Sequence, residues 1–191
     1  KVVTDLVAEI NKAKILALTL KQEFKTKSQK KFFIDQYFKN DNSFIYLGVY
    51  KKVEGEMEVV DSTFNQEFLK KVSLSEEDIL VPINKNLSYF VNSFDGIPTI
   101  LNTIPGFQEA SICLSIPIEE GEKSEYVLVI LLKLERILDA FKKSGINTTY
   151  MVNGDGMVLA HSDMSLVQSG KILMSTPIVR SMLTNQANNG L

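Results

Sequence analysis

Tyr126-Val-Leu-Val-Ile-Leu-Leu132 is the stretch that decides the fold of this 191-residue chain. The run is apolar throughout and rich in β-branched side chains, and it is about a third as long as the ~20 residues that a membrane-spanning helix needs. A short continuous run of this kind is typical of a strand that is covered on both faces. The sequence therefore predicts a central strand at this point.

A helix and a hairpin are predicted directly after this strand. Apolar residues recur at spacings of three and four over Glu135 to Lys143, which predicts a helix that ends before Gly145. Thr148-Thr-Tyr-Met-Val152 and Met157-Val-Leu-Ala-His161 then flank Asn153-Gly-Asp-Gly156. Asn-Gly and Asp-Gly tolerate the positive φ angles of a two-residue turn, so this is the strongest hairpin signal in the chain.

The first forty residues contain neither Gly nor Pro and predict two helices, one from Val2 to Ser28 and one from Lys30 to Phe38. At 1.5 Å per residue the first would be roughly 40 Å long. Two interpretations stay open: an ordinary core helix, or a stalk that pairs with a second copy of the chain. The apolar stripe that would serve either role is Val3, Leu6, Ile10, Ala13, Ala17, Leu20 and Phe24.

The middle of the chain predicts strands joined by short helices and loops. Alternating small polar and aliphatic residues predict a half-buried strand over Ala110 to Ile118, antiparallel to the central strand, with Ser111, Cys113 and Ser115 on one face. Three prolines and two glycines predict mostly loops between Val81 and Gly106. The other expected elements are strands at Ser43–Lys51, Met57–Thr63 and Thr99–Thr103, a turn at Glu54–Glu56, a helix at Asn65–Val72 capped by Thr63 or Asn65, and a helix that Ser75 opens.

The composition argues against a nucleic-acid-binding protein. The net charge is −2, whereas a nucleic-acid binder needs a basic surface, so no nucleic-acid partner is expected. The charge is uneven, because nine lysines face four acids up to Asn40, whereas the remainder is acidic. The single cysteine permits no internal disulfide, and no signal-peptide pattern is visible.

These elements predict an α+β fold in which an antiparallel sheet is flanked by a long N-terminal helix. Tyr150-Met-Val-Asn-Gly-Asp-Gly-Met-Val-Leu-Ala-His-Ser-Asp163 resembles the Cache domains, PAS-like extracytoplasmic sensor domains of bacterial transmembrane receptors. In that family a strand ending in Asp-x-Asp-Gly precedes a strand reading roughly Val-Ile-Ala-His-Pro-Asp. Here Ser162 stands where Pro is usual, Leu166-Val-Gln-Ser-Gly-Lys171 follows in place of a Leu-Val-Gly-Lys-like segment, and Thr176 to Leu183 resembles the next helix.

The resemblance implies a double-Cache arrangement. Residues 1–31 would form the long stalk helix, 32–145 a membrane-distal PAS-like module that binds ligand, and 146–191 the truncated beginning of a membrane-proximal module. It also implies attachment to the membrane through flanking segments, and a homodimer in the intact receptor.

A ligand pocket in such a module lies between the sheet and the helices and loops that cover it. The candidate residues from alternation are Tyr46, Tyr50, Tyr89, Phe94, Ser111 and Cys113, although the aromatic ones are also what an ordinary core would contain. Amino-acid-binding relatives carry an Arg-Trp-Tyr-like cluster, but this chain has no tryptophan and no arginine before Arg136. Lys85 is the available electrostatic substitute, and tight binding of α-amino acids is not expected.

No catalytic, metal or cofactor site is expected. Asp155 fits the needs of a turn, and His161 is the only histidine, too few for an unaided zinc site. Asp163 ends the hairpin, and no nucleophile stands beside a base. The sequence thus favours a non-catalytic module that senses a small molecule outside the cytoplasm, in a chemoreceptor, histidine kinase, nucleotide cyclase or phosphatase. A structural or adhesive surface domain is the alternative.

Overall fold

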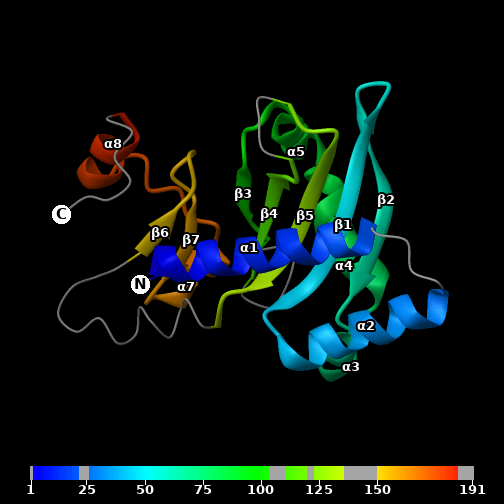
Figure 1. The fold of residues 1–191 in the computed structure, drawn as a ribbon. Coiled ribbons are helices and arrows are strands. Elements are labelled where there is room, and N and C mark those ends of the chain that lie inside the picture. Colours follow the sequence, from blue (N-terminus) through cyan, green and yellow to red (C-terminus); the bar gives the residue numbers. More distant parts are fainter. Residues whose placement is uncertain (1, 22–25, 104–110, 120–122, 136–149, 185–191) are drawn as a thin grey trace. The chain divides into compact units, whose positions relative to one another are not determined.

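A computed structural model of the chain describes residues 2–21, 26–103, 111–119, 123–135 and 150–184 (Figure 1). It consists of two compact units: residues 1–99 with 113–133 (unit 1), and residues 100–112 with 134–191 (unit 2). The elements are α1 (Val2–Lys21), α2 (Lys27–Asn40), β1 (Phe44–Val53), β2 (Glu56–Phe64), α3 (Gln66–Val72), α4 (Glu76–Lys85), α5 (Leu87–Phe90), η1 (Val91–Asp95), β3 (Thr99–Asn102), β4 (Ser111–Pro117), β5 (Tyr126–Lys133), β6 (Tyr150–Val152), β7 (Val158–His161), α7 (Met164–Gln168) and α8 (Pro177–Thr184).

The predicted α+β class and the central strand are confirmed. The main sheet has the order β2-β1-β5-β4-β3, and β1 pairs with both β2 and β5 in antiparallel register. Residues Val127 to Leu132 of β5 are all buried, as expected of a strand with a neighbour on each side and cover on both faces.

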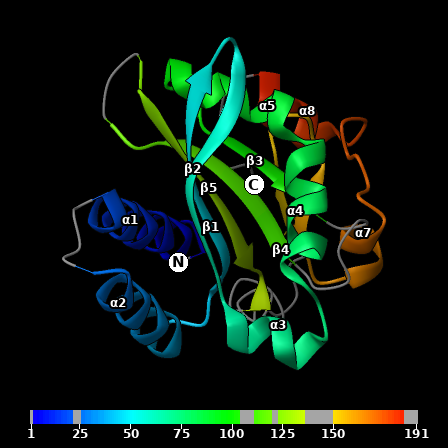
Figure 2. The same cartoon turned by 90° about the vertical axis from the view of Figure 1, so that its right-hand side faces the viewer.

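Helices cover both faces of the sheet in unit 1. Figure 2 shows α1 and α2 on one side of β1 and β5, and α4 and α5 on the other. Ala13, Leu16 and Ala17 of α1 are buried, so this part of α1 packs as a core helix, whereas Ile79 and Ile83 of α4 are buried on the opposite layer. The predicted half-buried character of β4 is wrong, because every residue from Ser111 to Pro117 is buried.

The N-terminal helix is shorter than predicted. It ends at Lys21 within the described residues, and Thr26 has extended backbone angles (φ −145°, ψ 154°). The Thr26 hydroxyl accepts a hydrogen bond from the Gln29 N–H, which caps the start of α2. A single helix to Ser28 is therefore wrong, and α1 is about 30 Å long at 1.5 Å per residue.

Local signals explain the other boundaries. Glu54 and Gly55 have positive φ angles (52° and 92°), which join β1 to β2 through a tight turn. Asn65 caps α3, and Ser75 caps α4 through reciprocal bonds with Asp78. The expected loops after Val81 are instead helical as far as Asp95, with Pro82 buried inside α4.

Unit 2 contains the predicted hairpin of β6 and β7. The Asn153 N–H donates to the Met157 carbonyl, so the connection has three residues rather than the predicted two, with Gly156 at φ 74°. Val158 and Val167 form a small core with partly buried Val152, Met164, Leu166 and Leu173. The α8 helix confirms the prediction for Thr176 to Leu183, whereas the helix predicted at Glu135 to Lys143 and the boundary at 145 lie outside the described residues.

Candidate functional site

A buried pair of tyrosines forms the centre of the candidate site in unit 1. The Tyr46 and Tyr50 hydroxyl oxygens are 2.8 Å apart, and both side chains are buried. Gly48 lies between them on β1, where an added Cβ would come within 2.2 Å of the Tyr46 hydroxyl oxygen. Because side chains alternate along a strand, Tyr46, Gly48 and Tyr50 share one face, and the rings close over the glycine.

The two hydroxyls are neutral at physiological pH. Burial raises the pKa of Tyr46 far above its ordinary value of 10.0, and the nearby Tyr50 and Cys113 raise it further. Burial also raises the pKa of Tyr50, although its hydrogen bond with Tyr46 acts in the opposite direction. The site therefore offers hydroxyl donors and acceptors without any charge.

Cys113 raises the pKa of both tyrosine hydroxyls, and its own side chain is fully buried. Burial raises the pKa of its thiol well above the usual range, so the thiol stays protonated and unreactive. We call Tyr46, Tyr50, Gly48 and Cys113 the tyrosine cluster.

Serine hydroxyl groups form hydrogen bonds between the sheet and the helical layer made by α4, α5 and η1. The Ser93 hydroxyl donates to the Ser115 carbonyl at 3.0 Å, and the Ser115 hydroxyl donates to the Phe90 carbonyl at 3.5 Å. Phe90 and Phe94 are both buried in this layer. The sheet face that holds the tyrosine cluster thus combines apolar side chains with a few neutral polar groups, as small-molecule sites do.

The structure separates the other predicted site residues. Tyr46, Tyr50 and Cys113 come together, and Phe94 is buried in the same unit. Tyr89 is 58% exposed on α5, and Lys85 is exposed at the end of α4. Ser111 belongs to unit 2, where its hydroxyl lies 2.6 Å from the Thr103 hydroxyl.

The polar residues of the hairpin have structural partners. His161 is buried, and its Nδ1 accepts a hydrogen bond from the Asp163 N–H at 2.7 Å. The Asp163 carboxylate accepts from the Ser165 hydroxyl and N–H, which lowers the pKa of Asp163 and caps α7. Asn153, rather than the exposed Asp155, supports the turn, because its Oδ1 accepts the Asp155 and Met157 N–H groups. Among the described residues no three His, Cys, Asp or Glu side chains gather into a metal-binding group.

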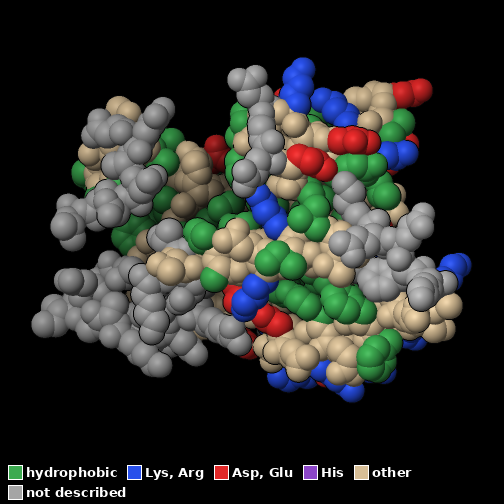
Figure 3. All heavy atoms as spheres, in the orientation of Figure 1, with side chains coloured by type: hydrophobic (Ala, Val, Ile, Leu, Met, Phe, Trp, Pro, Cys, Tyr) green, Lys and Arg blue, Asp and Glu red, His purple; other side chains and the backbone are tan. Residues whose placement is uncertain are grey.

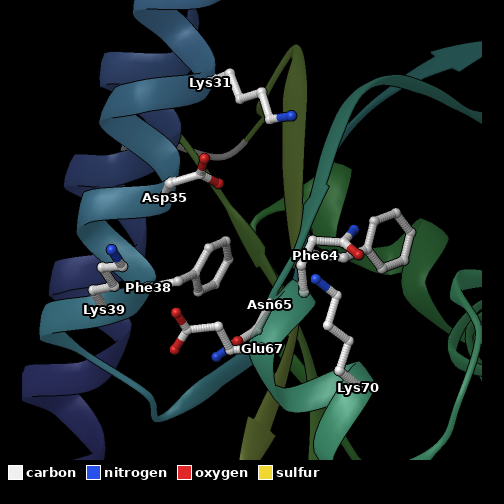
Figure 4. Close-up of a pocket in the computed structure, with 9 residues that line it drawn as sticks. Lys31, Asp35, Phe38, Lys39, Phe64, Asn65, Glu67 and Lys70 are labelled. Atoms are coloured by element: carbon white, nitrogen blue, oxygen red, sulfur yellow. The ribbon is translucent and has the colours of Figure 1, made fainter.

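Unit 1 also contains a surface feature that was not predicted from the sequence. It is a groove of about 490 Å³ between α2 and the corner where β2 runs into α3 (Figure 4). The α2 wall is formed by Lys31, Asp35, Phe38 and Lys39. The facing wall is formed by Phe64, Asn65, Gln66, Glu67 and Lys70. The sequence signal that could have found it is the recurrence of charges at intervals of four along α2, which is the spacing of one helical face.

Comparisons with known proteins give weak similarities to chemoreceptor sensory domains. No protein-family model and no curated protein match the chain. The ligand-binding domain of the Pseudomonas aeruginosa amino-acid chemoreceptor PctC, solved with GABA, is 16% identical with a TM-score of 0.46, over 89% of this chain and 72% of that one. The sensory domain of the Campylobacter jejuni chemoreceptor Tlp3, solved with isoleucine, is 12% identical with a TM-score of 0.43, over 95% of this chain and 72% of that one. Similarities of this size assign neither ligand to this chain.

Proposed function

We propose that this chain is an extracytoplasmic sensor domain of a membrane receptor and that unit 1 binds a small molecule at the tyrosine cluster. The observation that carries the proposal is the Tyr46–Tyr50 hydroxyl pair, buried at 2.8 Å over Gly48 on a sheet face that helices cover. The Cache resemblance of Tyr150 to Asp163 gives the receptor context.

The physical basis is the cost of burying polar groups. A buried hydroxyl without a compensating hydrogen bond costs about 1–3 kcal/mol. The Tyr46 and Tyr50 hydroxyls bind each other, and Ser62 is a further hydrogen-bond partner of Tyr46. A ligand with a hydrogen-bonding group can replace one of these partners, while its apolar part packs against the helical layer. Moving either ring also changes the packing between the sheet and α4, α5 and η1, which is how ligand binding would alter the domain.

The part of the ligand that contacts the tyrosine cluster is expected to carry no net charge. The tyrosine cluster contains no cationic side chain that could hold a carboxylate, and the nearest sequence candidate, Lys85, is exposed. We therefore expect free α-amino acids to bind weakly here. Within the described residues no helix is long and apolar enough to cross a membrane, and membrane attachment through flanking segments is part of the proposal.

A thermal-shift screen of small molecules against the wild-type domain and the Tyr46→Phe/Tyr50→Phe double variant tests the proposal. We expect at least one compound to raise the Tm of the wild type by several degrees and the double variant to lose that rise. A compound set that leaves Tm unchanged would favour a structural or adhesive surface domain. A rise that survives the double substitution would place the ligand elsewhere.

A further inference from the structure

Charged side chains line the α2–α3 groove in unit 1. Three lysines and two acids line it: Lys31, Asp35 and Lys39 on α2, and Glu67 and Lys70 on α3. None of these five groups forms an ion pair with another described residue. A volume of about 490 Å³ lies within the ~300–1,000 Å³ range of small-molecule sites.

The groove is a fixed feature of unit 1, because α2 is attached to the sheet beside it. Lys30 of α2 forms an ion pair with Asp61 of β2. Tyr37 of α2 packs against Phe44 of β1, with ring centroids 6.0 Å apart. These contacts hold α2 against the sheet while its neighbouring face remains open toward α3.

The walls differ in what they offer a ligand. Phe38 projects from α2 toward the groove and provides an apolar surface, whereas the Phe64 ring turns away from α2 (Figure 4) and packs on Tyr46 at 5.0 Å. The amides have other partners: Asn65 caps α3 and binds the Phe44 carbonyl, and Gln66 donates to Glu76. The ammonium and carboxylate groups are therefore the polar groups that remain available.

The balance of these charges selects the sign of the ligand. Asp35 stands four residues from both Lys31 and Lys39, and Glu67 stands three residues from Lys70. Side chains at these spacings are neighbours on a helix, so each carboxylate has an ammonium group beside it on its own helix. Three ammonium groups against two carboxylates leave one positive charge in excess.

We infer that the α2–α3 groove binds a small organic anion, with its acidic group between Lys31 and Lys70 and its apolar part against Phe38. Such a ligand joins α2 to α3. This site is separate from the tyrosine cluster and does not depend on the function proposed for it.

An NMR titration of the protein with three probes of one shape tests the inference: benzoate (anionic), benzyl alcohol (neutral) and benzylamine (cationic). Benzoate should bind in the millimolar range, as expected of a ligand of about nine heavy atoms. The backbone amides of Phe38, Lys39 and Glu67 should shift, while those of Tyr50 and Ser115 should stay in place. Equal binding of all three probes, or shifts confined to Tyr50 and Ser115, would overturn the inference.

Substitutions of the charged groove residues should change benzoate affinity in opposite directions. Lys70→Gln should weaken benzoate binding by about tenfold, as for the loss of one charge-assisted hydrogen bond. Asp35→Asn should strengthen it. Lys85→Gln, an exposed lysine on α4, is the matched control and should leave it unchanged. The inference is wrong if Lys85→Gln has as large an effect as Lys70→Gln, or if Asp35→Asn weakens binding.

Discussion

The Tyr46 hydroxyl meets the Tyr50 hydroxyl at 2.8 Å, four residues apart on one strand, across a glycine. Residues two apart on a strand face the same way, so any side chain at position 48 would stand between the two rings. A Cβ there would lie 2.2 Å from the Tyr46 hydroxyl oxygen and 2.8 Å from Cε2 of Tyr50. Gly48 is thus a requirement of this hydroxyl pair.

Gly48→Ala should destabilise the protein, because both tyrosine rings must move in a packed interior. Overpacking of this kind costs about 1–3 kcal/mol. Urea unfolding followed by circular dichroism measures the loss. Gly154→Ala is the matched control, since a Cβ at position 154 meets nothing within 4 Å. Equal stability of the Gly48→Ala variant and the wild type would show that the rings do not close over this position.

Cys113 should react only when the protein unfolds. Burial raises the pKa of its thiol, so at pH 8 the native protein holds little of the reactive thiolate, whereas an unfolded cysteine with a pKa of ~8.5 ionises. We expect iodoacetamide labelling to be slow in buffer and fast in urea, with a midpoint that follows the unfolding curve. Rapid labelling of the native protein would show that Cys113 is reached without global unfolding.

The sequence predicted those parts of the fold in which one short stretch contains the decisive signal. The apolar run from Tyr126 to Leu132 predicted the central strand, and Asn153 to Gly156 predicted the hairpin. Helix α4 was missed beyond Val81, because Pro82 normally ends a helix. There the burial of Ile79, Pro82 and Ile83 favours continuing the helix, and burial depends on residues far away in the chain.

The residues of the candidate site also differ in whether a local sequence pattern predicts them. Alternation along β1 placed Tyr46 and Tyr50 on one face correctly, because a strand fixes that relation locally. Only the residue type favours Tyr89 as a site residue, and the structure leaves it exposed on α5. The groove brings Lys31 and Lys70 together across 39 positions of sequence, and no local pattern encodes such a distance.

In unit 2, Asn102→Ala should loosen the hairpin. The Asn102 side-chain amide donates to the carbonyl oxygens of Val158 and Val167, both at 2.9 Å, in a buried position. Removing the amide leaves buried carbonyls without this donor, at a cost of about 1–3 kcal/mol. Hydrogen exchange of the β7 amides should accelerate accordingly. Asn84→Ala, at an exposed position of α4, should leave this exchange unchanged.

The stability of unit 1 should fall in acid because of Asp41. Burial alone raises the pKa of this carboxyl, but hydrogen bonds from the Lys12 ammonium group at 2.9 Å and the Ser43 N–H at 3.0 Å outweigh it, and the pKa lies below 3.8. An acid with a lowered pKa stabilises the fold above its unfolded pKa and loses this effect as pH falls through the folded value. The contribution is thus present at pH 6 and declines below about pH 4.

Asp41→Asn tests this pH dependence. Urea midpoints measured between pH 6 and pH 2.5 should fall less steeply for the variant than for the wild type. Asp155→Asn is a suitable control, because Asp155 is exposed in the turn of the hairpin. If the urea midpoints of Asp41→Asn and the wild type fall equally as the pH decreases, other carboxyl groups cause the acid sensitivity.

The final prediction concerns pairing between two copies of the chain through α1. Of the positions that the sequence suggested for pairing, Ala13 is buried against the sheet of its own unit and is excluded. Val7, Ile15 and Leu18 are instead 49%, 65% and 48% exposed, and hydrophobic side chains are visible on the surface over α1 (Figure 3). Val7 and Leu18 are eleven residues apart, about three helical turns, so they lie on one face. We propose that this face pairs in the intact receptor.

Single cysteine substitutions in the full-length receptor, followed by oxidation, test the pairing. Crosslinking should be high at positions 7, 15 and 18 and absent at position 13, because the buried side chain of Ala13 cannot reach a second copy. The membrane-tethered form is needed, since tethering raises the effective concentration of the partner to the millimolar range. A profile that is flat along α1, or one that peaks at position 13, would remove the pairing role and leave α1 as a core helix alone.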